Sequence, residues 1–324
     1  METVMAQPTR TLAPRPLPSI ADGIDDLVGN TPLLRLPVAH RAPGADVLAK
    51  LECANPAASV KDRAALYMLR AAEADGRLRP GGVVVEATSG NTGIALAALC
   101  AARGHRCIIV LPDNATPERI GLLRRFGADV VLTPREARYQ GAVDKAEEIC
   151  AMTPGAWFVR QHDNDDNPRA HRETTGPEIW ADTGGQVDVL VCGVGTGGTL
   201  SGTAGYLKDR NPALLAVAVE PAGSPLLSGG TAGTHAIPGF NGGFVAPTTD
   251  LDLIDEVVTV TDDEAADTSR WLARRVGVLA GVSSGAATHV ALRVARRRSS
   301  VDKRIVVILP DTGERYLSMW SERP

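Results

Sequence analysis

Lys61 lies in a segment whose residue types suit a lysine that forms an imine. The segment is Asn-Pro-Ala-Ala-Ser-Val-Lys-Asp-Arg, residues 55–63. Ser59 suits a helix N-cap and residues 64–68 begin an apolar helix, so Lys61 should lie in its first turn. A desolvated lysine beside a cationic group, here Arg63, has a lowered pKa and can form an imine with an aldehyde. The plainer alternative is a solvated surface lysine.

A second segment, Glu-Ala-Thr-Ser-Gly-Asn-Thr-Gly at residues 86–93, could receive a carboxylate. It lies between a strand predicted at residues 83–85 and a helix predicted to begin near Gly93. Hydroxyl groups, a side-chain amide and free backbone N–H groups would therefore gather at a helix N-terminus, which attracts anions. The alternative is an ordinary N-cap with turn glycines.

A third segment, Gly-Val-Gly-Thr-Gly-Gly-Thr at residues 193–199, follows a predicted strand and precedes a predicted helix. Glycines let the backbone approach an anion closely, and Thr196 and Thr199 add hydroxyl donors, which together favour a phosphate site. A dinucleotide site stays open as a rival. The full dinucleotide pattern, in which an acidic residue follows G-x-G-x-x-G about 20 positions on at a strand end, is lacking, although Glu220 lies close to where that acidic residue would be.

A fourth segment, Gly-Val-Ser-Ser-Gly-Ala at residues 281–286, lies at a turn that enters a predicted helix. A serine hydroxyl can bond to a pyridine nitrogen without keeping a proton on it. The ring would then be a moderate electron sink, which suits β-elimination better than transamination.

These four segments, in this order and at these separations, resemble the fold-type II pyridoxal-phosphate enzymes, and within them the cysteine synthase (O-acetylserine sulfhydrylase) and cystathionine β-synthase group. The likeness runs from about Asp25 to Leu317. The stretch Ser-Pro-Leu-Leu-Ser-Gly-Gly at residues 224–230 favours cysteine synthase over the cystathionine enzyme. Further matching segments lie at residues 29–36, 174–180, 220–230 and 311–318.

The resemblance implies an α/β fold like that of the tryptophan synthase β subunit. Two three-layer domains with parallel-rich sheets would hold the active site between them. The larger cofactor domain would comprise residues 21–54 and 166–324, and the smaller, mobile substrate-binding domain residues 55–165. Residues 1–20, rich in Pro, Thr and Ala, are predicted to form a disordered arm.

The resemblance also assigns roles to individual residues, with pyridoxal 5'-phosphate as the cofactor. Lys61 would be the catalytic lysine that carries the cofactor as a Schiff base. The predicted cofactor-binding residues are Lys61, Asn91 at the phenolic oxygen, Gly195, Thr196, Gly197, Gly198 and Thr199 at the phosphate, and Ser283 at the pyridine nitrogen. The predicted residues for the substrate α-carboxylate are Thr88, Ser89, Gly90, Thr92 and Gln161.

The reaction that the resemblance implies is β-replacement on O-acetyl-L-serine, or a related activated serine, through an α-aminoacrylate intermediate, with sulfide giving L-cysteine. Once the substrate displaces Lys61, its free amine would act as the general base. The implied partners are an amino-acid substrate, a small nucleophile, a second copy of the chain in a homodimer, and the C-terminus of serine acetyltransferase.

Two positions depart from the cysteine synthase pattern. His162 follows Gln161 where an aromatic residue is usual, and residues 239–243 read Gly-Phe-Asn-Gly-Gly where a run of glycines with a small residue is usual. His162 and Asn241 are therefore candidates for acceptor specificity. The nucleophile could be larger or more polar than sulfide, as in specialised β-substituted alanine synthases, or the activity could resemble that of cystathionine β-synthase. The alternative is that His162 is structural.

Two other classes of protein compete with this hypothesis. A non-catalytic O-acetylserine sensor would not need Lys61, which is present. A nicotinamide-dependent dehydrogenase would have no use for the turns at residues 59–63 and 283–286.

The elements that must position these segments alternate along the chain as in a parallel sheet covered by helices. An amphipathic strand is predicted at residues 47–52. Buried strands, apolar on both faces, are predicted at residues 83–85, 107–110, 130–132, 187–191, 214–219 and 305–309. Helices are predicted at residues 93–103, 117–126, 142–151 and 265–275.

The composition of the chain argues against several other classes of protein. The chain has 324 residues, 44% of them hydrophobic, so it can bury a large core. Its net charge of −4, with no basic run beyond residues 296–298, argues against nucleic acid. Five scattered cysteines predict neither a metal site nor disulfides and suggest the cytoplasm. No apolar stretch approaches the roughly 18 residues that a membrane span needs.

Overall fold

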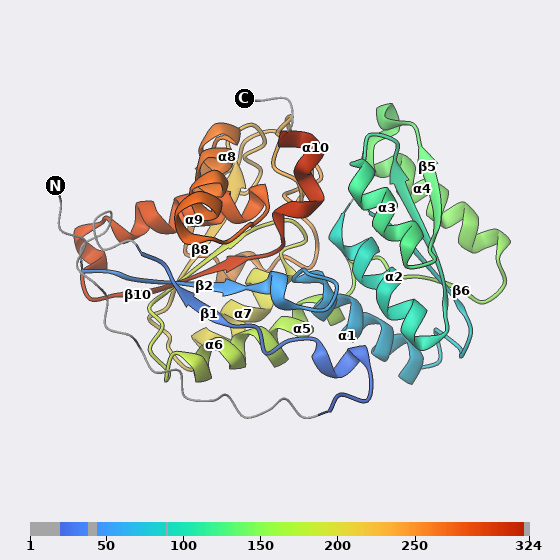
Figure 1. The fold of residues 1–324 in the computed structure, drawn as a ribbon, viewed down its shortest axis with the longest axis horizontal. Coiled ribbons are helices and arrows are strands. Elements are labelled where there is room, and N and C mark those ends of the chain that lie inside the picture. The colour runs from blue at the N-terminus through green and yellow to red at the C-terminus, as the bar shows by residue number, and fades with distance from the viewer. Residues whose placement is uncertain (1–19, 38–43, 89, 321–324) are drawn as a thin grey trace.

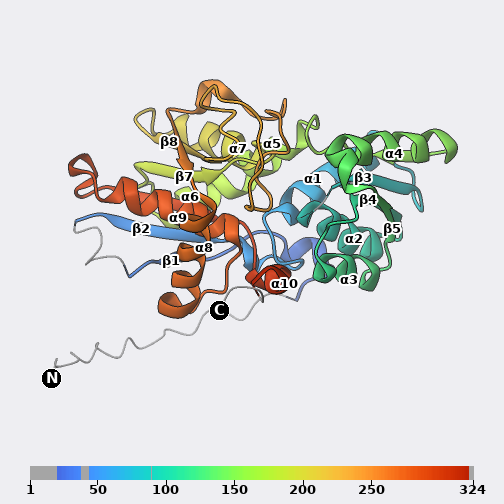
Figure 2. The ribbon, with the colours of Figure 1, turned by 90° about the horizontal axis from the view of Figure 1, so that it is seen from above.

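A computed structural model describes residues 20–37, 44–88 and 90–320, which fold around two β-sheets (Figure 1). The predicted arm falls almost entirely outside this part of the chain, because residues 1–19 are not described. The larger sheet has six strands and the smaller has four. A view from above shows the two sheets side by side along the long axis of the molecule (Figure 2).

The larger sheet has the strand order β1-β2-β10-β7-β8-β9. All neighbours are parallel except β1 and β2. Most of its strands are buried on both faces, as expected of a parallel sheet covered by helices. The strands are β1 (Leu33–Arg35), β2 (Asp46–Leu51), β7 (Val189–Gly193), β8 (Leu215–Pro221), β9 (Glu256–Val260) and β10 (Arg304–Leu309).

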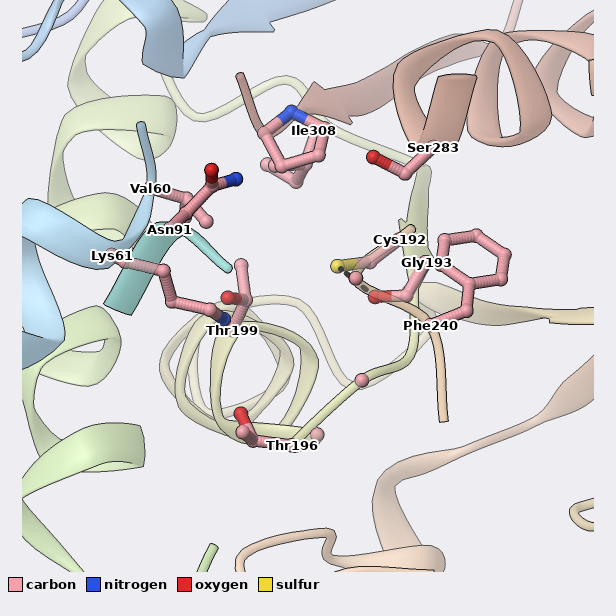
Figure 3. Close-up of a pocket in the computed structure, with 14 residues that line it drawn as sticks. Val60, Lys61, Asn91, Cys192, Gly193, Thr196, Thr199, Phe240, Ser283 and Ile308 are labelled. Carbon is pink, nitrogen blue, oxygen red and sulfur yellow. Dashed lines mark hydrogen bonds between the residues drawn. The ribbon is translucent and has the colours of Figure 1, made fainter. Parts of the chain in front are cut away.

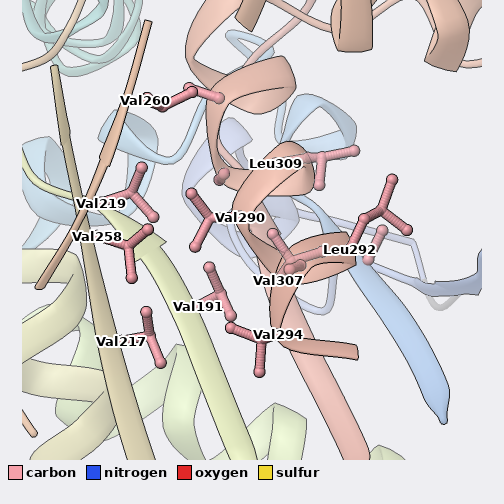
Figure 4. Close-up of a cluster of buried hydrophobic side chains, with 14 of the residues drawn as sticks. Val191, Val217, Val219, Val258, Val260, Val290, Leu292, Val294, Val307 and Leu309 are labelled. Carbon is pink, nitrogen blue, oxygen red and sulfur yellow. The ribbon is translucent and has the colours of Figure 1, made fainter. Parts of the chain in front are cut away.

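Alternate residues of these strands face different helices. Val189 and Val191 pack with α8 (Asp262–Trp271) and α9 (Val282–Ala295), whereas Leu190 packs with α6 (Gly176–Asp182) and α7 (Gly198–Lys208). Figure 4 shows the first of these two clusters, in which valines of the sheet meet those of α9. Each fully buried valine or leucine stabilises the fold by about 1.5–3 kcal/mol.

The smaller sheet is all parallel, in the order β5-β4-β3-β6. Its strands are β3 (Val83–Ala87), β4 (Arg106–Pro112), β5 (Asp129–Thr133) and β6 (Ala156–Phe158). One face packs against α1 (Lys61–Ala74), α2 (Asn91–Arg103) and α3 (Pro117–Arg125). The other face packs against α4 (Arg138–Met152).

The remaining helices connect or flank the sheets. The short helix α5 (Asp166–Ala170) continues through the π-helical turn η4 (His171–Thr175) into α6. Near the C-terminus, α10 (Leu317–Trp320) lies against α3 in both ribbon views. The Ser318 backbone N–H donates to Glu118 Oε1 of α3 over 2.7 Å. The C-terminal segment therefore bridges the two sheets.

The predicted strands are found with shifted ends, and three corrections concern their detail. Residues 46–51 are not amphipathic, because β2 is buried on both faces and Lys50 is paired with Glu178 and Asp182. β5 is not buried on both faces, because it is an edge strand in which Leu132 is 45% exposed. β1, β6 and β9 were not predicted. Two of them have only three residues, too few to show an alternating pattern.

Two helix predictions also need correction. Val60, not Ser59, is the N-cap of α1, although the Ser59 hydroxyl accepts a hydrogen bond from the Lys61 N–H over 3.2 Å. The helix predicted at residues 265–275 begins earlier as α8 and changes at Leu272 into the π-helical turn η6 (Leu272–Val276). Within the described residues no helix is long and apolar enough to cross a membrane.

Each sheet falls within one of the two predicted domain ranges, since the smaller sheet uses strands between residues 83 and 158. The exact boundaries at residues 54 and 165, and the mobility of the smaller domain, stay predictions. Among the described residues, no group of His, Cys, Asp and Glu could hold a metal ion, and the five cysteines are free.

Candidate active site

A cavity between the two sheets brings together residues from the first, second, third and fourth segments identified in the sequence (Figure 3). Lys61 and Ser283 point their polar ends into it from opposite sides. β7 and β10 end at its wall, as expected for a ligand site at the carboxyl edge of parallel strands. The lining residues are Val60, Lys61, Asn91, Cys192, Gly193, Gly195, Thr196, Gly197, Thr199, Gly239, Phe240, Ser283, Ile308 and Pro310.

Lys61 begins α1 and holds its amino group inside this cavity. Desolvation by burial lowers the pKa of that amino group, and the nearby Asp311 carboxylate opposes the shift only in part. Among the described residues the amino group has no hydrogen-bond or ion-pair partner. A lowered pKa favours the neutral form of the amine, which is the form that attacks an aldehyde.

Arg63 does not lower the pKa of Lys61, contrary to the prediction. Its guanidinium is fully buried and donates to Glu52 Oε2 over 2.7 Å and to Glu178 Oε1 over 2.6 Å. Its charge is therefore matched by two carboxylates, and neither Arg63 nor these carboxylates line the cavity. Arg63 instead ties the start of α1 to Glu52, which directly follows β2, and to Glu178 of α6, and desolvation alone accounts for the lowered pKa of Lys61.

The third segment forms a close-packed loop at the N-terminus of α7. Gly197 has a φ of 77°, a left-handed conformation that favours glycine, and a Cβ atom there would collide with Thr249. A Cβ atom on Gly195 would collide with the Gly239 carbonyl, and one on Gly198 with Asn167. Backbone N–H groups at this helix end can bind an anion. Gly198 begins α7 but is not one of the lining residues.

Buried side chains fix both threonines of this loop. The Thr196 hydroxyl accepts a hydrogen bond from Asn167 Nδ2 over 3.0 Å, and the Thr196 carbonyl accepts one from Thr248 over 2.5 Å. The Thr199 hydroxyl lies 3.2 Å from His171 Nε2. Desolvation lowers the pKa of His171 well below its ordinary value, so this imidazole is neutral.

Asn91 is held by two residues of the C-terminal segment. Its Nδ2 donates to Asp311 Oδ2 over 2.7 Å, and its Oδ1 accepts from Arg315 Nη1 over 2.6 Å. These two bonds fix the orientation of the carboxamide, which leaves one N–H of Nδ2 for another acceptor. Residues 311–318 were predicted as a matching segment, but neither Asp311 nor Arg315 was predicted to have a role.

The predicted substrate residues that the structure describes also come together. The Thr92 hydroxyl donates to Gln161 Oε1 over 2.5 Å, and the Gly90 N–H donates to the Thr88 hydroxyl over 3.2 Å. Asn167 Nδ2 donates to the Gln161 carbonyl over 2.9 Å as well as to Thr196, so it joins this group to the glycine loop. Ser89 lies outside the described residues. Asn167 was not predicted to belong to the site.

Glu86, near the end of β3, forms hydrogen bonds with the backbone of residues 160 and 161. Its carboxyl oxygens accept hydrogen bonds from the Arg160 N–H over 2.9 Å and from the Gln161 N–H over 3.4 Å. Arg160 has a φ of 54°, which is uncommon for a residue with a side chain. Desolvation raises the pKa of Glu86 from 4.5 to about 8, although both hydrogen bonds oppose the shift.

This raised pKa predicts a pH-dependent stability. Folded Glu86 keeps its proton to about pH 8, whereas the unfolded carboxyl loses it near its ordinary pKa of 4.5. Between these values the unfolded state binds fewer protons, so the free energy of unfolding falls as pH rises, by up to about 1.4 kcal/mol per pH unit. Glu86→Gln should flatten this decline. Urea denaturation of both proteins at several pH values measures it, and equal slopes would contradict the assignment.

His162 and Asn241 differ in where they lie. His162 packs with Tyr139 and Phe244 at ring-centroid distances of 5.1 Å each. Asn241 is engaged with Ser224, since it donates to the Ser224 carbonyl over 3.0 Å and accepts from the Ser224 hydroxyl over 3.1 Å. Only His162 lines a second cavity beside the first. A role in acceptor specificity stays a prediction for both residues.

The chain is similar to known proteins over most of its length. The model of the pyridoxal-phosphate dependent enzyme family matches residues 24–311. A probable cysteine synthase of Bacillus subtilis is 48% identical over 301 residues, which cover 91% of this chain and 96% of that protein. The crystal structure of a cysteine synthase from Entamoeba histolytica has a TM-score of 0.91 at 37% identity and covers 95% of this chain and 93% of that one. An O-ureido-L-serine synthase structure has a TM-score of 0.89 at 42% identity, with 93% and 94% covered.

The chain belongs to the pyridoxal-phosphate-dependent enzymes. Its similarity to cysteine synthases over nearly the whole chain also confirms the predicted fold-type II architecture and the predicted cofactor, pyridoxal 5'-phosphate. The dehydrogenase alternative is set aside, because the family uses pyridoxal phosphate and not a nicotinamide cofactor. The sensor alternative is set aside, because the family and the similar cysteine synthase are enzymes.

Proposed function

We propose that this chain is a cysteine synthase, which replaces the acetyl group of O-acetyl-L-serine by sulfide to give L-cysteine and acetate. The observation that carries this proposal is a single cavity that holds the desolvated Lys61 amine, the glycine loop before α7 and Ser283. The similarity to cysteine synthases over about nine tenths of the chain supports it.

The residues present fit pyridoxal phosphate. Lys61 offers an unpartnered amine for the aldehyde, and the loop at residues 195–199 offers N–H and hydroxyl donors for the phosphate. Asn91 would donate its remaining N–H to the phenolic oxygen, and Ser283 would meet the ring nitrogen. When bound, the cofactor supplies an electron sink for the bonds at the substrate Cα.

The chain's own residues would orient the substrate and move its proton. Thr88, Thr92, Gly90 and Gln161, together with Ser89, would hold the α-carboxylate at the N-terminus of α2, where the helix dipole favours an anion. The Cα–H bond would then face Lys61, whose lowered pKa keeps the amine free to accept that proton and to return it after sulfide adds.

The finer predictions on partners and location belong to this proposal. We expect a homodimer and a binding site for the C-terminus of serine acetyltransferase, as the family resemblance implies. A cytoplasmic location agrees with five free cysteines.

The proposal predicts a coloured protein that responds to its substrate. Purified protein should be yellow, and O-acetyl-L-serine should shift its visible band to longer wavelength. Addition of sulfide should restore the starting spectrum and release cysteine in equal amount to acetate. A yellow protein whose spectrum does not change with O-acetyl-L-serine would contradict the proposed substrate. A colourless protein would contradict the proposed cofactor site.

A further inference from the structure

Two buried charged residues of the C-terminal segment, Asp311 and Arg315, hold one uncharged side chain of the cavity wall. They are 1% and 3% exposed. Burial raises the pKa of the Asp311 carboxyl, and the charge of Arg315 is among the groups that oppose this shift. Among the described residues the two side chains do not form a direct ion pair with each other. Both instead form a hydrogen bond with the carboxamide of Asn91, which lies between them.

The two bonds have opposite polarity, so they distinguish the two ends of the Asn91 carboxamide. Its Oδ1 accepts from Arg315 Nη1 over 2.6 Å, and its Nδ2 donates to Asp311 Oδ2 over 2.7 Å. A guanidinium can only donate. The Tyr316 hydroxyl donates to the same Asp311 oxygen, which is therefore an acceptor whether or not the other oxygen carries a proton. A half-turn of the carboxamide would bring acceptor against acceptor and donor against donor, and both bonds would be lost.

The orientation of this carboxamide decides what Asn91 offers to the cavity. Asn91 lines the cavity that contains Lys61, and its carboxamide reaches toward the interior from the same side (Figure 3). The two ends of a carboxamide are nearly equal in size, so packing alone does not tell them apart. With both bonds in place, the group left for a ligand is the second N–H of Nδ2. After a half-turn, a carbonyl oxygen would take its place.

The two charged residues are themselves held by other parts of the fold. Arg315 Nη2 donates to the Ala57 carbonyl in the turn before α1, and the Arg315 carbonyl accepts from the Thr116 hydroxyl over 3.1 Å at the start of α3. The backbone of Asp311 pairs with that of Ser59 in an isolated antiparallel bridge. The positions of both charged groups are therefore set by protein contacts, before any ligand binds.

We propose that Asp311 and Arg315 are positioning residues, which turn an N–H of Asn91 and not its carbonyl toward the phenolic oxygen of the cofactor. This inference rests on the proposed role of Asn91 at that oxygen. A facing N–H favours the anionic form of the oxygen, whereas a facing carbonyl would repel it. Neither Asp311 nor Arg315 is among the residues that line the cavity, so both act through Asn91.

The test measures cofactor affinity and the visible spectrum. Arg315→Met and Asp311→Leu each remove one of the two bonds, and each should weaken the binding of pyridoxal phosphate to cofactor-free protein at least about tenfold. In the holoenzyme, the visible band should lose intensity to a band at shorter wavelength over a range of pH, because the phenolic oxygen is more often protonated. Asp311→Asn keeps an acceptor oxygen and should lose less affinity than Asp311→Leu.

A double-mutant cycle separates positioning from a general structural role. In the background of Asn91→Leu, which has no carboxamide to orient, Arg315→Met and Asp311→Leu should each weaken cofactor binding by less than about twofold more. Arg304→Met is the control. Arg304 begins β10 outside the cavity and donates to Asp46 over 2.9 Å, so its loss should leave affinity and spectrum unchanged. Circular dichroism checks the fold, and if one of the two variants does not fold, the other carries the same test.

The possible outcomes separate this inference from the proposed function. An unchanged spectrum and affinity in Arg315→Met and Asp311→Leu, with a loss in Asn91→Leu, would overturn the inference and leave the proposed function standing. A full tenfold loss in the Asn91→Leu background would also overturn it, because the charged residues would then act without Asn91. Unchanged affinity in Asn91→Leu itself would contradict the proposed role of Asn91. A colourless original protein that forms no cysteine would contradict the proposed function.

Discussion

Lys61→Ala should lower kcat/KM for cysteine formation from O-acetyl-L-serine and sulfide by at least about ten-thousand-fold. The variant loses both the amine that carries the cofactor and the base that moves the substrate proton, and general-base catalysis alone is worth about a hundred- to ten-thousand-fold. The fold should persist, because the start of α1 is held by Arg63 and its carboxylate partners. Steady-state assays and circular dichroism measure the two properties.

Lys208→Ala is the matched control for this experiment. Lys208 ends α7 and forms a surface ion pair with Asp255 at 2.7 Å. Loss of such a pair costs about 0–1 kcal/mol of stability and should leave turnover unchanged. A Lys61→Ala variant that forms cysteine within tenfold of the original rate would contradict the role of Lys61.

Gly197→Ala should weaken cofactor binding at least about a hundredfold. The added Cβ atom would collide with Thr249, so the loop must move away from its place in the wall of the cavity, where its N–H groups would bind the phosphate. A hundredfold loss corresponds to about 2.7 kcal/mol. Titration of cofactor-free protein with pyridoxal phosphate, followed by visible absorption, measures the affinity.

Gly277→Ala separates the collision from backbone strain. Gly277 has the same φ of 77° as Gly197, but it is exposed, and a Cβ atom added there would have no other atom within 4 Å. Both substitutions place an alanine in the left-handed conformation, which costs about 1–2 kcal/mol. Only Gly197→Ala also disturbs the predicted phosphate site. Equal cofactor affinity in both variants would contradict that assignment.

The parts of the fold that could be predicted are those with local signals. Runs such as residues 305–309 are apolar on both faces because β10 is central in its sheet, and the structure places it there. β5 has a similar composition, but its place at the sheet edge leaves Leu132 exposed. Position in the sheet is set by strand order, which no single segment contains.

The candidate site shows the same division. The motifs point to Lys61, Asn91, Ser283 and the glycine loop, and these line one cavity. The motifs do not show why the loop needs its glycines. Thr249 and Gly239 leave no room for side chains there, and both lie more than 40 residues away in the chain. The prediction that Arg63 lowers the pKa of Lys61 was wrong for the same reason. Its neighbour in sequence is Lys61, but its partners in space are Glu52 and Glu178.

The site residues that were not predicted act through other residues. Asn167 joins Gln161 to Thr196, while Asp311 and Arg315 hold Asn91. None has a spacing that would indicate these contacts in advance. The second cavity, which His162 lines, likewise combines α4, the turn after β6 and the loop at residues 242–244, and it could be recognised only in three dimensions.

The central claim is that the Lys61 amine carries the cofactor. Borohydride reduction of the yellow holoenzyme, followed by proteolysis and mass spectrometry, tests it most directly. We expect one pyridoxyl group per chain, on the peptide that contains Lys61, and no label in Lys61→Ala. A pyridoxyl group found on Lys50 or another lysine instead, with residue 61 unmodified, would contradict the account.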